Sequence, residues 1–123
     1  MLFRSDAKDF LLREMVNNLY RYYYKAANLK KIGYSHIVHS YVLASISCIL
    51  NGKLGKAWKI ISEIESEENT IKKYKEIIKI MSERVSKGKQ VELNNFPYNL
   101  RRLIESSEEI LYLLKLFKGF KIR

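Results

Sequence analysis

The sequence predicts an all-α protein, an antiparallel bundle of four to five helices in a single domain over residues 1–123. Apolar residues recur at three- and four-residue steps in every periodic segment, and no segment alternates as a strand would. Five glycines and one proline divide the chain into four such segments. With 123 residues, 47% of them hydrophobic, the chain can bury one substantial core.

The first two segments predict helices over about residues 6–32 and 35–51. Ser5 can cap the first helix and Gly33 can stop it. Ser35 can cap the second helix, and Gly52 can end it. The second helix is apolar over most of its circumference, so we expect it to be the central and most buried helix.

The third segment, residues 54–87, carries a heptad seam of mainly apolar residues. One helix over this whole segment would be roughly 50 Å long, which exceeds the width of a compact domain of this mass. Either its far half protrudes, or it breaks near residues 66–69. An acidic run followed by Asn69 and Thr70 favours the start of a new helix at that point.

The fourth segment predicts one helix over about residues 97–118. Pro97 suits a first helical turn, and the apolar residues that follow form one stripe. The residues between Gly88 and Asn95 are expected to form a loop held in place by Val91 and Leu93.

Residues 22–52 contain small residues, a glycine and tyrosines at positions typical of a helical hairpin: Ala26, Leu29, Gly33, Tyr34, Tyr41 and Ala44. In these residues the segment resembles the hairpin of tetratricopeptide units and of the microtubule-interacting and trafficking domain. It also resembles a hairpin in an archaeal family of uncharacterised helical proteins. The resemblance implies an antiparallel helical pair and a scaffold-like role, and it transfers no site residues.

The charge distribution suggests a polyanionic partner. The net charge is +10, and residues 15–62 contain seven cations and no acidic residue. Cations alternate with aromatic residues around residues 21–25, a pattern that suits phosphate contacts combined with base stacking. The first functional hypothesis is therefore a non-catalytic accessory protein that binds nucleic acid, or belongs to a nucleoprotein assembly, through Arg21, Tyr24, Lys25, Lys30, Lys31, Lys53, Lys56 and Lys59.

Two other interpretations stay open. Some of these tyrosines can belong to the core while the cations serve only solubility, because three consecutive residues span about 200° of a helix. Alternatively, the seam from Ile64 to Val85 can bind a partner helix or a second copy of the chain through Ile71, Tyr74, Ile78 and Met81.

No catalytic, cofactor or metal motif is present, so we expect no enzyme activity, no cofactor and no metal. His36 and His39 share a helix face but lack a third ligand nearby. The clustered carboxylates stand beside lysines at helical salt-bridge spacing. Cys48 lies among apolar residues and is expected to be buried. No export signal or membrane span is recognisable, which predicts a cytoplasmic protein.

Overall fold

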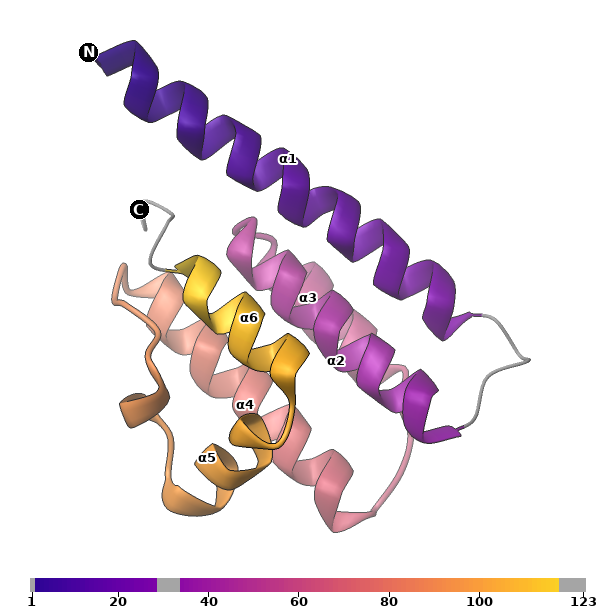
Figure 1. Ribbon diagram of the computed structural model, residues 1–123. Helices are drawn as coiled ribbons and strands as arrows, with labels where there is room; N and C mark the ends of the chain where they lie inside the picture. Colours follow the sequence, from indigo (N-terminus) through magenta and orange to yellow (C-terminus); the bar gives the residue numbers. More distant parts are fainter. Residues whose placement is uncertain (1, 29–33, 118–123) are drawn as a thin grey trace.

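The computed structural model describes residues 2–28 and 34–117 (Figure 1). Within these ranges the chain forms six packed α-helices and no strand, which confirms the all-α class. The elements in chain order are α1 (Leu2–Ala27), α2 (Tyr34–Leu50), α3 (Leu54–Ser62), α4 (Asn69–Ser86), the 3-10 turn η1 (Leu93–Asn95), α5 (Tyr98–Glu105) and α6 (Glu108–Leu116).

The central helix is α2, as its composition predicts. It packs against α1, α3, α4 and α6, and every residue from 42 to 50 is buried. The buried hydroxyl of Ser47 donates to the Leu43 carbonyl at 2.8 Å, so this polar group keeps a hydrogen bond inside the core. On one side of α2, the long helix α1 packs alongside it (Figure 1).

Gly52, the predicted end of the second helix, and Gly88, where the predicted loop begins, end their helices in the same way. Gly52 has a φ of 75°, a left-handed conformation that favours glycine. Its N–H donates to the Ile49 carbonyl and the Lys53 N–H donates to the Cys48 carbonyl, both at 2.9 Å. This pair of bonds is a Schellman motif. An equivalent motif ends α4 at Gly88, whose φ is 69°. Gly33, the expected stop of the first helix, lies outside the described residues, and α1 ends at Ala27.

The third segment breaks, so of the two alternatives the broken helix is confirmed. The break starts slightly earlier than residues 66–69: α3 ends at Ser62, and α4 begins at Asn69. The extended residue Glu68 precedes α4, and its N–H donates to the Ser66 hydroxyl at 3.2 Å. The break lets α4 pack against both α2 and α3, so α4 does not protrude.

The single helix expected over residues 97–118 is wrong, because the chain turns at Ser106 and Ser107. The Ser107 hydroxyl accepts a hydrogen bond from the Ile110 N–H at 3.2 Å and so caps a new helix, α6. Pro97 stands directly before α5. With this second break the described part of the chain has more helices than the four or five expected.

Candidate nucleic-acid interface

A hollow of about 390 Å³ lies between α1 and α3. Tyr20 and Tyr24, one turn apart on α1, line one side, and Lys56, Lys59 and Glu63 line the other, together with Gly55 and Ile60. The two helices leave this space because both pack chiefly on α2. Gly55 adds to the opening, since a Cβ atom there would meet nothing within 4 Å.

A carboxylate held by tyrosine lies at one end of the hollow. The Tyr24 hydroxyl donates to Oε1 of Glu63 at 3.2 Å. The rings of Tyr24 and Tyr41 meet edge to face, with centroids 6.3 Å apart. Burial and then the Glu63 carboxylate raise the pKa of both tyrosines. Both hydroxyls therefore stay protonated at neutral pH, and the Tyr24 hydroxyl can donate to Glu63.

A cation covers one of the aromatic rings. The Lys56 ammonium lies 4.3 Å from the centre of the Tyr20 ring, within cation–π range. Hydrogen bonding to Tyr20 raises the pKa of Lys56, while partial burial opposes that rise. Lys56 is thus fully charged at neutral pH, and it connects α3 to α1 across the hollow.

The described cations of the predicted site are all exposed. Arg21 and Lys25 lie on α1, Lys56 and Lys59 lie on α3, and Lys53 directly precedes α3. The hollow brings together Tyr24, Lys56 and Lys59 from the predicted set. Lys30 and Lys31 lie outside the described residues.

The ring of Tyr24 is half-buried and packs against Tyr20 and Tyr41, so Tyr24 lies in the wall of the hollow. Two aromatic residues of this region are exposed: Tyr22, which is 68% exposed and follows Arg21 directly, and Trp58, which is 46% exposed and lies between Lys56 and Lys59 on α3. Tyr22 lies within the basic segment of residues 21–25 but is absent from the predicted site. Tyr20 and Glu63 are also absent from the predicted site. Tyr20 stands one helical turn before Tyr24, a spacing that is visible in the sequence. Glu63 is the first residue after α3.

The predicted partner-binding seam faces the chain's own core. Ile71, Ile78 and Met81 are at most 2% exposed and belong to the main hydrophobic cluster. Tyr74 is half-buried, and that burial raises its pKa. A partner cannot reach the three buried side chains in this fold. The prediction that the seam is a binding surface is therefore wrong for these residues, which belong to the core. The heptad spacing reflects packing within the chain.

A polar cluster joins α2 to the start of α6. His39 Nε2 lies 3.3 Å from Oε2 of Glu109 and 3.5 Å from the Ser107 hydroxyl. In a catalytic triad the carboxylate and the serine use different ring nitrogens, whereas both groups here meet the same one. Ser107 is only 7% exposed and caps α6. The cluster therefore holds two helices together and does not form a nucleophilic site.

The described residues contain no group of three or more His, Cys, Asp or Glu side chains that could hold a metal ion. His36 is exposed on α2, and the hydrogen bonds to Glu109 and Ser107 are made by His39. Burial raises the pKa of Cys48 to about 11, although Lys56 and Lys53 oppose the rise. This thiol is a buried apolar group at neutral pH.

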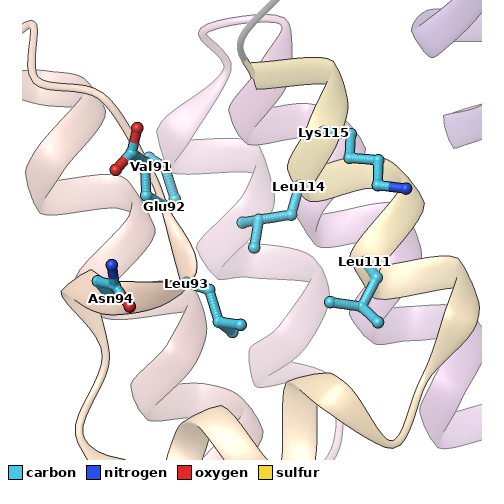
Figure 2. Close-up of a pocket in the computed structure, with 7 residues that line it drawn as sticks. All are labelled: Val91, Glu92, Leu93, Asn94, Leu111, Leu114 and Lys115. Carbon is cyan, nitrogen blue, oxygen red and sulfur yellow. The ribbon is translucent and has the colours of Figure 1, made fainter.

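A second pocket, of about 260 Å³, lies between η1 and α6 (Figure 2). Leu93 and Leu114 point into the space between the two elements, whereas the charged ends of Glu92 and Lys115 point away from it (Figure 2). Ligand sites usually combine an apolar wall with polar groups that converge on one point. Asn94 also lines this pocket, but the charged ends of Glu92 and Lys115 do not converge on its interior, so the hollow between α1 and α3 is the better candidate site.

No protein family matches this sequence, and neither a curated protein nor a solved structure shows significant similarity to it. Among the helices in the described ranges, none is long and apolar enough to cross a bilayer.

Proposed function

We propose that the protein binds nucleic acid through the surface formed by α1 and α3. The observation that carries the proposal is the exposure of five cations on and beside these helices, in a stretch of sequence that contains no acidic residue. These cations are Arg21, Lys25, Lys53, Lys56 and Lys59.

Phosphate groups are the chemistry that this surface suits. Arg21 and Lys25 are one turn apart on α1, and Lys56 and Lys59 are three residues apart on α3, so each pair lies on one side of its helix. Neighbouring cations of this kind can each contact a phosphate of the same strand and release condensed counterions. Nearby lysines also raise the local concentration of a polyanion and speed its association.

Aromatic groups on these two helices favour a single strand. Tyr20 and Tyr24 line the hollow, Trp58 is exposed between Lys56 and Lys59 on α3, and Tyr22 is exposed on another side of α1. Bases of a single strand can stack on such rings, whereas the bases of a duplex are already stacked on one another. The proposed activity is non-catalytic, since none of the described clusters has the geometry of a nucleophilic or metal site.

Binding of a fluorescent ten-nucleotide strand, as RNA and as DNA, tests the proposal by anisotropy at about 50 mM salt. We expect the variant R21Q/K25Q/K56Q/K59Q to lose at least tenfold in affinity, because four phosphate contacts are removed. The matched control K79Q/K87Q/K89Q/K115Q removes the same charge at exposed positions on other elements and should lose much less. Equal losses would indicate diffuse attraction without a site, and no binding by the wild type would refute the proposal.

A further inference from the structure

The hollow between α1 and α3 has a volume of about 390 Å³, inside the roughly 300–1,000 Å³ that is usual for small-ligand sites. Its polar groups fall into two kinds. Lys56 and Lys59 offer positive charge from α3, and Glu63 offers a carboxylate at the C-terminal end of the same helix. A fitting ligand therefore carries an anionic group at one end and hydrogen-bond donors at the other.

The orientation of the Glu63 carboxylate is set before any ligand arrives. The Tyr24 hydroxyl donates to Oε1 at 3.2 Å, and Tyr24 itself is held against the ring of Tyr20, with centroids 5.8 Å apart. The Tyr41 hydroxyl also hydrogen-bonds to this carboxylate. A carboxylate can accept about four hydrogen bonds, so Glu63 can accept two more. These can come only from groups that donate.

We propose that this hollow binds a single unpaired guanine of the strand, with Glu63 accepting hydrogen bonds from its base edge and Lys56 and Lys59 contacting the adjacent phosphates. The inference rests on the proposed function. Guanine presents two neighbouring N–H donors, N1–H and the N2 amino group, which match the two oxygens of a carboxylate. Adenine, cytosine and uracil each place an acceptor next to their donor, and an acceptor facing Glu63 is repelled.

The tyrosine walls suit a flat base. Tyr20 and Tyr24 lie one turn apart on α1, and both rings line the hollow, so a base that enters it meets an aromatic wall. The Lys56 ammonium now covers Tyr20. Because Lys56 is exposed, its side chain can turn from the ring to the incoming phosphate, exchanging a cation–π contact for a charge-assisted hydrogen bond.

The test compares oligonucleotides that differ in one base. Ten-nucleotide strands of uridine as RNA, or of thymidine as DNA, are prepared with and without one central guanine and with inosine in its place. We expect the wild type to prefer guanine by about tenfold, within the range for a bidentate contact to a base. Inosine lacks the N2 amino group and should recover only part of this preference.

Three variants distinguish the base pocket from general binding. E63Q should abolish the preference, because an amide offers only one acceptor. Y24F should weaken it, because the carboxylate loses one of the two tyrosine hydroxyls that orient it. E65Q removes the same charge from an exposed position two residues away and should keep the preference. Circular dichroism establishes that each variant is folded.

Each outcome decides one point. If the wild type binds all strands equally well and loses affinity on substitution of Arg21, Lys25, Lys56 and Lys59, then the proposed function stands and the guanine pocket is refuted. A preference that survives E63Q also refutes the pocket. If no strand binds at about 50 mM salt, both proposals are refuted.

Discussion

Replacing Ile78 by alanine should lower the free energy of unfolding by about 3–4 kcal/mol. Ile78 is 0% exposed in the middle of α4. The substitution removes three carbon groups, and at about 0.8 kcal/mol for each buried group the lost transfer energy is about 2.4 kcal/mol. The cavity left in a core packed from several helices adds to this loss. For a chain of 123 residues, the melting temperature should fall by about 12–15 °C.

Urea and thermal unfolding followed by circular dichroism, with light scattering on the same samples, measure this effect. Ile80→Ala is the matched control, since Ile80 is the same residue type on the same helix but is only partly buried. It should lose about half as much stability or less. A loss below about 1 kcal/mol at Ile78, or a fall in oligomer mass with stability unchanged, would refute the placement of α4 in the core.

Three further predictions concern individual side chains. Ser107→Ala should cost about 1 kcal/mol in urea unfolding, because α6 loses its cap, whereas Ser106→Ala should cost less; equal losses would contradict the capping role. Hydrogen bonds from its own N–H and from His39 hold the pKa of Glu109 below its ordinary value, although burial opposes this. Its stabilising contribution is therefore present above about pH 4.5 and disappears as the pH falls through the lowered pKa. The melting temperatures of the wild type and E109Q should converge in acid, and a gap that widens there would refute this. Finally, Cys48, whose pKa is raised to about 11, should react with iodoacetamide at pH 8 about 100-fold more slowly in the folded protein than in urea; rapid labelling of the folded protein would show that it is not buried.

Helix content and the positions of two helix ends could be predicted from the sequence because both depend on local chemistry. A three- and four-residue apolar repeat buries one side only in a helix. Gly52 and Gly88 end their helices because both adopt positive φ, which costs any other residue more. Both the apolar repeat and the positive φ of glycine are local properties, so they do not depend on how the rest of the chain packs.

The break at Ser107 was missed because apolar periodicity continues across it. Leu103 and Ile104 before the turn, and Ile110 and Leu111 after it, contact the same core, so the pattern looks like one uninterrupted stripe. The signal that was overlooked is a serine followed by two glutamates, which is typical of a capped helix start.

The candidate site was only partly predictable, for a different reason. That the lysines and arginines would be exposed follows from the cost of burying a charge. Which tyrosine would be exposed depends on how α1 is rotated against α2, and that rotation is decided by tertiary packing. Tyr24 therefore points to the hollow and Tyr22 to solvent. Glu63 belonged to an acidic run interpreted as a solvated surface, and the end of α3 places it beside Tyr24 instead.

The central claim is that the cations of α1 and α3 form a phosphate-binding surface, and the salt dependence of binding tests it most directly. Contacts with four to six phosphates predict that log affinity falls against log salt with a slope of roughly −3 to −5, depending on strandedness. Replacing Arg21, Lys25, Lys56 and Lys59 by glutamine should flatten this slope, while the control K79Q/K87Q/K89Q/K115Q should leave it nearly unchanged. A slope near zero in the wild type, or the same flattening in both variants, would contradict the claim.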